Sequence, residues 1–192
     1  MLATYSTWAV RCLTNSNLKV NTMNKVIYAS FLSLLTACAT QTQSPTASAQ
    51  LTPTKGNATA GSVTFTQSGT KVLVIAEIRG LKPNAEHGFH IHEKGDCSSG
   101  DGMSTGGHFN PTTQPHGAHG SGNHHSGDLP SLVADANGVA KLKFESTTIS
   151  VDSGVSNIIG RGLIVHRDPD DYKTQPTGNA GPRLACAVIN KT

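Results

Sequence analysis

Short segments of alternating apolar and polar residues recur along this chain, separated by glycine, proline and asparagine. Residues 62–66, Ser-Val-Thr-Phe-Thr, alternate strictly, which is typical of a strand with one buried face. Apolar and β-branched residues fill 72–78 and 163–165, and Asn137-Gly138 lies between two further runs, as in a tight β-hairpin. The pattern predicts eight strands, at residues 47–54, 59–67, 71–79, 87–92, 129–135, 139–145, 162–167 and 184–190.

These strands predict an all-β domain, because no helical period or internal repeat interrupts them. Two stretches break the pattern, residues 93–128 and 168–183, which are rich in glycine, proline and polar residues. Loops of this length inside a compact domain are usually either functional or disordered. We favour function, because the histidines described next lie in or beside them. For residues 168–183, a plain surface connection is the alternative.

Histidines gather where the strand pattern gives way to these loops. If residues 87–92 form a strand, His90 and His92 leave the same face, because alternate strand side chains do. The later histidines lie among few large apolar residues, so core packing does not explain them. The candidate ligands are His90, His92, His108, His116, His125, Asp128 and His166. Six imidazoles and one carboxylate predict a site for two metal ions that carry out the chemistry.

The distribution of charge excludes one class of partner. The formal net charge is +3, but residues 1–38 hold three basic residues and no acidic one, which leaves 12 basic and 12 acidic residues in the rest of the chain. A nucleic-acid-binding protein needs a basic patch or stripe, and the sequence has none. We therefore expect no nucleic-acid partner.

The start of the chain predicts export. From Met23 the sequence reads Met-Asn-Lys, then about a dozen mostly apolar residues, then Cys38, which is the architecture of a secretory signal. The apolar run is shorter than the roughly 20 residues that span a bilayer. The Leu-Thr-Ala-Cys motif that ends at Cys38 resembles a bacterial lipobox. Residues 23–38 are therefore predicted to be a lipoprotein signal peptide with Cys38 lipidated; an ordinary signal with an incidental cysteine is the alternative.

The export signal sets the predicted domain plan. Residues 1–22 lack an apolar run, so we predict that they are an upstream extension that is not native and that Met23 is the true start. Residues 39–48, rich in Ala, Thr, Gln, Ser and Pro, are predicted to be a flexible tether, and residues 49–192 the folded domain. The lipobox and Ala39 after it predict a periplasmic protein, attached by its lipid alone to the outer membrane of a Gram-negative bacterium.

The four cysteines are Cys12, Cys38, Cys97 and Cys186. With Cys12 upstream of the proposed start and Cys38 lipidated, one pair remains in an exported domain, where an oxidising compartment favours a disulfide. A Cys97–Cys186 bridge would close a loop of about 90 residues, worth on the order of 4 to 5 kcal/mol in the chain-entropy model. Two free buried thiols are the alternative.

Several motifs together resemble those of the copper/zinc superoxide dismutases, from about residue 47 to the end of the chain. They are Gly88-Phe89-His90-Ile91-His92-Glu93, Gly95-Asp96, Gly107-His108-Phe109-Asn110-Pro111, His125-Ser126-Gly127-Asp128-Leu129, Val165-His166 and Gly178-Asn179-Ala180-Gly181-Pro182-Arg183-Leu184-Ala185-Cys186. The resemblance implies an eight-stranded antiparallel Greek-key barrel or sandwich, immunoglobulin-like, with two long active-site loops.

The resemblance also implies which residues bind each metal. The implied copper ligands are His90, His92, His108 and His166; the implied zinc ligands are His108, His116, His125 and Asp128. His108 would bridge the two metals as an imidazolate. Imidazole suits both metals, and three nitrogens with one carboxylate give zinc a closed tetrahedral shell.

Other residues receive roles from the same resemblance. Arg183 matches the family's active-site arginine, whose guanidinium would attract and orient the superoxide anion. Asp170 matches a carboxylate that links a copper histidine to a zinc histidine, with Asp171 as its competitor for that role. His119 and His124 match no ligand position. We interpret them as solvated loop histidines, and the other hypothesis is that they help to capture metal when it is scarce.

The implied function is dismutation of superoxide to oxygen and hydrogen peroxide, by a redox-cycling copper bridged through a histidine to a structural zinc, in protection of the cell envelope. One alternative is a non-enzymatic periplasmic copper/zinc buffer or chaperone on the same fold, which would not need Arg183. Another is a surface adhesion domain, which would leave the metal ligands unexplained. A homodimer is one option for assembly, but the loop from Cys97 to His108 is longer than in eukaryotic members, so their dimer contact does not carry over.

Overall fold

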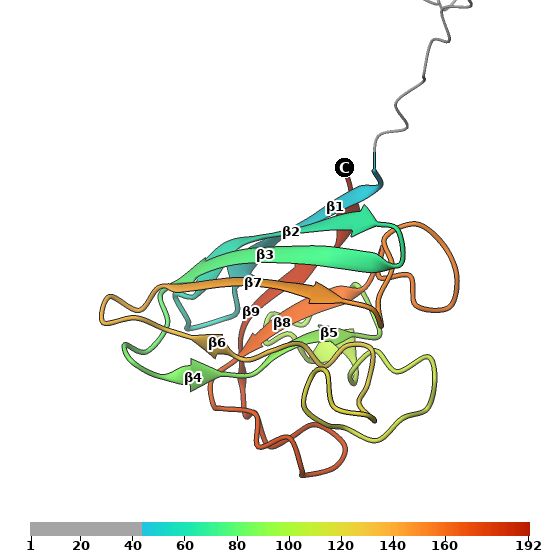
Figure 1. Cartoon of the computed structure of the whole chain (residues 1–192). Coiled ribbons are helices and arrows are strands. Elements are labelled where there is room, and N and C mark those ends of the chain that lie inside the picture. The colour runs from blue at the N-terminus through green and yellow to red at the C-terminus, as the bar shows by residue number, and fades with distance from the viewer. Residues whose placement is uncertain (1–43) are drawn as a thin grey trace, which may run out of the picture. The chain divides into compact units, whose positions relative to one another are not determined.

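Most strands of this chain form one curled sheet, and two short strands form a second (Figure 1). The structure is a computed structural model, and it describes residues 44–192. The predicted extension 1–22, the signal peptide 23–38 with Cys38, and residues 39–43 of the tether lie outside the described residues. The strands are β1 (Thr46–Pro53), β2 (Ala60–Ser68), β3 (Lys71–Arg79), β4 (Glu86–His87), β5 (Phe89–His92), β6 (Leu132–Val133), β7 (Ala140–Ser146), β8 (Gly162–His166), β9 (Arg183–Val188) and β10 (Asn190–Lys191), and one 3₁₀ turn spans Met103–Thr105.

The main sheet has eight antiparallel strands in the order β5-β8-β9-β1-β2-β3-β7, with β10 paired to β1. β1 joins the two halves of the sheet, because residues 46–51 pair with β2 whereas Thr52 and Pro53 pair with β9. β8 lies between β9, the next strand along the chain, and β5, from which it is far removed in sequence. The architecture confirms the predicted all-β, antiparallel Greek-key fold. Within residues 44–192, no helix is both long enough and apolar enough to cross a membrane.

A two-stranded ribbon of β4 and β6 completes the wall between β5 and β7 (Figure 1). β4 leads into β5 with only Gly88 between them. β6 leads into β7 through the Asn137-Gly138 turn, where the Gly138 N–H donates to the carbonyl oxygen of Asp135 at 3.0 Å. Gly138 has a φ of 72°, a conformation that glycine adopts without strain. The dipeptide forms a tight turn as predicted, but the hairpin predicted there is wrong, because β6 pairs with β4 and β7 pairs with β3.

The apolar positions of the alternating strands form one core. Buried and more exposed residues alternate along β2 and β3, and Val63, Phe65 and Val74 are each 0% exposed. β5 and β8 differ, because every residue in them is buried. A strand covered on both faces can hold polar side chains out of water on the face that lies away from the core.

Three of the predicted strands differ from the structure by more than a shift of one residue. Residues 87–92 are divided at Gly88 into β4 and β5. The strand predicted at 129–135 shrinks to Leu132–Val133, and Pro130 before it has no N–H to donate to a neighbouring strand. The strand predicted at 184–190 ends at Val188, after which the chain pairs with β1 as β10.

The first strand begins before the predicted end of the tether. β1 begins at Thr46, so residues 46–48 belong to the sheet, and the prediction that they are part of a flexible tether is wrong. Ala47 is 1% exposed and pairs with Phe65 of β2. The strand predicted at 47–54 matches β1 to within one residue, and the predicted tether overlaps it because Thr, Ala and Ser are also typical of linkers.

Candidate metal centre

The first histidine pair comes from β5, on the face that strand alternation predicted. Phe89 and Ile91 enter the core, and His90 and His92 are 0% exposed on the opposite face. The first long loop returns along β5, where isolated bridges join His90 to Asp128 and His92 to His108. This pairing brings loop residues that are distant in sequence beside the strand histidines.

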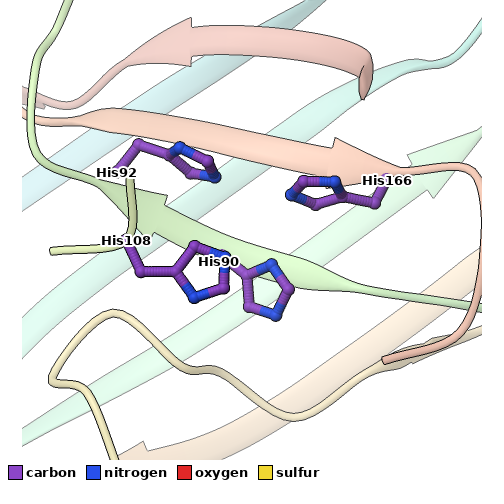
Figure 2. Close-up of side chains that lie close together, drawn as sticks. All are labelled: His90, His92, His108 and His166. Atoms are coloured by element: carbon purple, nitrogen blue, oxygen red, sulfur yellow. The ribbon is translucent and has the colours of Figure 1, made fainter. Parts of the chain in front are cut away.

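Four histidines surround one common space, with His92 and His166 facing each other across it (Figure 2). Ligand atoms of His90, His92, His108 and His166 lie within 4.8 Å of one another. In each ring one nitrogen is buried without a hydrogen-bond partner: Nδ1 of His90 and Nε2 of His92, His108 and His166. Because an unpartnered buried polar atom is costly, four of them together indicate a bound cation as the missing partner. A further unpartnered nitrogen, Nε2 of His87, belongs to neither metal cluster.

The second nitrogen of three of these rings is fixed by a hydrogen bond. The bonds run from His90 Nε2 to Asp170 Oδ2 (2.8 Å), from His92 Nδ1 to Gly106 O (2.9 Å) and from His166 Nδ1 to Gly181 O (3.1 Å). A ring that donates from one nitrogen keeps the lone pair of the other free, which is the form that binds a metal. The hydrogen bonds therefore set both the tautomer and the direction of each candidate ligand.

A second cluster adjoins the first and shares His108. Its atoms converge on Asp128 Oδ1, which lies 2.8, 3.1 and 3.2 Å from the Nδ1 atoms of His108, His116 and His125. The Nδ1 atoms of His108 and His125 are 3.5 Å apart. Four ligand atoms at zinc's usual distance of about 2.0 to 2.1 Å, placed tetrahedrally, would be about 3.3 Å from one another. The observed spacings fit such a shell.

The other oxygen of Asp128 is held by the protein main chain. Asp128 Oδ2 accepts hydrogen bonds from the N–H groups of Gly117 at 3.1 Å and His125 at 2.9 Å. Burial raises the pKa of Asp128, but its hydrogen bonds from histidine side chains outweigh burial and hold the pKa well below 3.8. Asp128 is therefore a carboxylate at neutral pH, with Oδ1 turned toward the three rings.

Asp170 links the two clusters. Its Oδ2 accepts a hydrogen bond from His90 Nε2 at 2.8 Å, and its Oδ1 accepts one from His116 Nε2 at 2.9 Å. Gly178 leaves room for this pair, because a Cβ there would collide with Asp170 Oδ1 and His116 Nε2. Asp171, the competitor for this role, is exposed and accepts bonds from its own loop. The geometry thus favours Asp170.

Burial keeps three of the ligand rings, those of His92, His108 and His166, neutral. It lowers the pKa of His92 and of His166 well below 6.5, and the nearby charges of other histidines and of Arg183 act in the same direction. It also lowers the pKa of His108 to about 4, although Asp128 opposes the change. His116 is the exception: burial lowers its pKa, but the carboxylates of Asp128 and Asp170 outweigh burial and raise it to about 9.

Arg183 begins β9 and extends under the first long loop. Its Nη2 donates to Gly106 O at 2.7 Å, and its Nη1 donates to Thr105 Oγ1 at 2.8 Å and to Gly102 O. A guanidinium cannot be deprotonated in proteins, so a fixed positive charge lies close enough to His92 and His166 to lower their pKa. The side chain is partly buried, which leaves part of it accessible to an anion.

Sequence reasoning missed two residues that support the site. Thr105 is 0% exposed, accepts the hydrogen bond from Arg183 and donates to Gly102 O at 2.9 Å. The side-chain amide of Gln175 holds the main chain of His116. Its Oε1 accepts from the His116 N–H at 2.8 Å, and its Nε2 donates to the His116 carbonyl oxygen at 2.9 Å. Neither residue type signals a metal site. Their positions in the two aperiodic loops were the available clue.

The disulfide predicted from the cysteine count is confirmed. Cys97 and Cys186 are bonded, with Cα atoms 6.0 Å apart and a sequence separation of 89 residues. Cys186 lies in β9, three residues after Arg183, and Cys97 lies in the first loop. The bridge therefore ties the loop that holds the guanidinium to the strand that carries it.

The interpretation of His119 and His124 as solvated histidines is wrong. His124 is 8% exposed, and His119 is half-buried against Phe144 of β7. Each donates a hydrogen bond to a main-chain carbonyl oxygen. The loop is compact enough to bury the two rings, although its composition is polar and rich in glycine.

The fold and the two clusters define the class of protein: an antiparallel β-barrel with two adjoining metal sites that share a histidine. Comparison with known proteins agrees. A family model described as copper/zinc superoxide dismutase (SODC) matches residues 59–189. A superoxide dismutase [Cu-Zn] of Paramecium bursaria Chlorella virus 1 is 45% identical over 135 residues, which cover 67% of this chain and 71% of that protein.

Two further relatives extend the match. A superoxide dismutase [Cu-Zn] 2 of Aquifex aeolicus is 37% identical over 161 residues, covering 82% of this chain and 94% of that protein. The crystal structure of the clock protein EA4 superposes with a TM-score of 0.70 at 43% identity, covering 78% of this chain and 96% of the other. This chain belongs to the copper/zinc superoxide dismutase family. It is an enzyme that dismutates superoxide, with copper and zinc as cofactors.

Proposed function

We propose a division of the ligands between the metals and a place of action in the cell. Copper is held by His90, His92, His108 and His166, and zinc by His108, His116, His125 and Asp128. The observation that carries this assignment is His108, whose Nε2 is unpartnered in the first cluster while its Nδ1 lies 2.8 Å from Asp128 in the second. One ring thus completes two four-residue sets.

In the reaction, two superoxide anions and two protons give oxygen and hydrogen peroxide. Copper, when bound, supplies the one-electron oxidation and reduction. His108 can hold a proton at Nε2 while Nδ1 stays beside Asp128. Arg183 draws the anion toward His92 and His166, because its guanidinium is held by three acceptors of the loop and cannot turn away. Asp170 keeps the orientations of His90 and His116 coupled.

We further propose that the enzyme acts in the periplasm, anchored by lipid at Cys38, and protects the cell envelope. The apolar run after Met23 and the lipobox support export. The Cys97–Cys186 disulfide agrees with an oxidising compartment.

Superoxide removal by the purified protein, metal-free and after loading with copper and zinc, tests the proposal. We expect copper-dependent activity near the diffusional limit of about 10⁸ to 10⁹ M⁻¹s⁻¹. His108→Gln is expected to weaken the binding of both metals, whereas the matched change His92→Gln weakens copper binding alone. Tight binding of both metals without activity would indicate a metal buffer instead. Loss of only one metal in His108→Gln would contradict the shared ring.

A further inference from the structure

His119 and His124 belong to neither cluster, but both bond to the main chain of zinc-cluster residues. His119 Nδ1 donates to the main-chain oxygen of Asp128 at 3.1 Å. His124 Nδ1 donates to the main-chain oxygen of His125 at 2.7 Å. Both acceptors therefore belong to residues whose side chains point into the zinc cluster. The loop has many other carbonyl groups, yet the half-buried ring of His119 and the buried ring of His124 bond to those of Asp128 and His125.

The pair also ties the loop to the barrel. The rings of His119 and His124 have centroids 5.3 Å apart, and the ring of His119 meets Phe144 of β7 edge-on at 5.1 Å. His124 Nε2 accepts the N–H of Gly120 at 3.4 Å, so the proton of this ring is on Nδ1. His119 therefore contacts β7 with its ring and the main chain of Asp128 with its Nδ1.

We propose that His119 and His124 are positioning residues for the zinc site, an inference that rests on the proposed zinc ligands. The Asp128 N–H also donates to His125 O, at 3.1 Å, so this carbonyl group receives two hydrogen bonds. With both carbonyl groups held, the turn 125–128 keeps the directions from which His125 Nδ1 and Asp128 Oδ1 meet.

The physical consequence is preorganisation. A loop whose ligands are already in place loses less conformational freedom when the metal binds, and so it binds more tightly. This role replaces the hypothesis that the two histidines capture metal themselves. The Nδ1 atom of each is already engaged with a carbonyl group, and His124 Nε2 is engaged with an N–H.

The test separates hydrogen bonding from metal ligation by the choice of substitution. The amide nitrogen of asparagine stands at the same distance along the side chain as histidine Nδ1, so His119→Asn with His124→Asn keeps both donors. His119→Leu with His124→Leu keeps apolar volume and removes them. Zinc affinity by competition with a chelator, and the visible spectrum of Co²⁺ bound in place of zinc, are measured for the whole protein.

We expect the leucine pair to bind zinc roughly tenfold more weakly and to shift the Co²⁺ bands, and the asparagine pair to stay close to the unchanged protein. Ser121→Ala is the matched control, because its hydroxyl bonds to Ala118 O at 2.6 Å and to no ligand residue. If the leucine pair does not fold, the two single leucine variants carry the same expectation.

Two outcomes overturn the inference. Unchanged affinity and spectrum in the leucine variants would show that the carbonyl bonds do not position the ligands. Equal weakening in the asparagine and leucine variants would assign the effect to ring packing or to direct ligation. Failure of the unchanged protein to bind zinc would instead contradict the proposed function, and the inference with it.

Discussion

An imidazole ring has two nitrogen atoms, and the four histidines of the first cluster each use both of them. His90, His92 and His166 each donate from one nitrogen and leave the other unpartnered. His108 presents one nitrogen to each cluster. At the scale of single residues, the protein therefore sets each ring's tautomer and direction before any metal arrives, which limits the reorganisation that binding requires.

The charge of Arg183 is expected to account for much of the rate. Arg183→Ala should lower the rate of superoxide removal by at least about tenfold at low ionic strength, because steering of a charged substrate contributes that much or more. The rate should also depend less on salt, since the cation that salt screens is gone. Stopped-flow rates across a salt series measure both effects, and metal analysis verifies that copper and zinc remain. An unchanged rate would contradict the steering role.

Thr105 is expected to act through Arg183. Thr105→Val keeps the shape of the side chain but removes the hydroxyl that accepts from Arg183 Nη1 and donates to Gly102 O. A hydrogen bond is worth about 1 kcal/mol net, which corresponds to roughly a fivefold change. We expect the affinity of the copper-loaded enzyme for azide, an anionic probe, to fall by about that factor. Thr105→Ser should restore it, and equal affinities in all three proteins would refute the idea.

At the scale of elements, two kinds of segment cooperate. β5 is rigid and carries His90 and His92 at alternate positions. The long loops carry all four residues of the second cluster and Asp170, and hydrogen bonds from the loops' own side chains hold them in shape. Asp171 is the clearest case in the second loop, where its carboxylate accepts from the N–H groups of Lys173 and Thr174 at 2.9 and 2.8 Å.

The stability that Asp171 provides should depend on pH. Its hydrogen bonds, first those from Thr174, lower its pKa to about 2, below the unfolded value of about 3.9. A lowered folded-state pKa stabilises the fold above the unfolded value, and the effect is lost as pH falls through the folded value. The metal-free Asp171→Asn variant should therefore have a lower free energy of unfolding than the unchanged metal-free protein at pH 7. The gap between the two free energies should narrow between pH 4 and 2.

Denaturant unfolding at several pH values measures this difference. Asp152→Asn, at an exposed aspartate in another loop, is the matched control and should show no comparable narrowing. A gap between Asp171→Asn and the unchanged protein that stays constant from pH 7 to pH 2 would show that the carboxylate charge does not hold the loop.

At the scale of the whole molecule, the barrel brings together groups that are far apart along the chain. The disulfide joins positions 97 and 186, and Arg183 of β9 bonds to residues 102–106 of the first loop. The charged guanidinium, the copper cluster and the zinc cluster are thus built on one rigid support. The lipobox before the barrel predicts that this unit works at a membrane surface without inserting in it.

The anchor should be separable from catalysis. Cys38→Ser removes the predicted lipid acceptor, so the protein should move from the membrane fraction to the soluble periplasmic fraction. Its activity per molecule, once loaded with copper and zinc, should not change, because the barrel begins only at Thr46. Fractionation of cells that express either form measures this. A soluble unchanged protein, or a Cys38→Ser form that stays with the membrane, would contradict lipid anchoring.

Much of the fold and of the site could be predicted from the sequence because the relevant signals are local. Strand alternation placed His90 and His92 on one face, and the cysteine count predicted the disulfide that the structure contains. The candidate metal ligands are histidine and aspartate, and the chemistry of these residue types makes them recognisable in a sequence. The same local signals placed β1 to within one residue but did not fix where the tether ends, because small residues are typical of both strand and linker here.

Only the tertiary structure decided the contacts made by main-chain carbonyl groups and by side chains such as that of threonine, which carry no metal-site signal. The carbonyl groups of Gly102 and Gly106 and the hydroxyl of Thr105 hold Arg183, yet nothing in their residue types indicates this. His119 and His124 are distinctive residues, but whether they face water, a metal or a carbonyl group depends on how the loop folds against β7. The sequence by itself determined the family, the strands and the ligand types, because these depend on periodicity and side-chain chemistry. The directions of the ligand side chains depend on the tertiary structure, because main-chain hydrogen-bond acceptors and burial fix each ring.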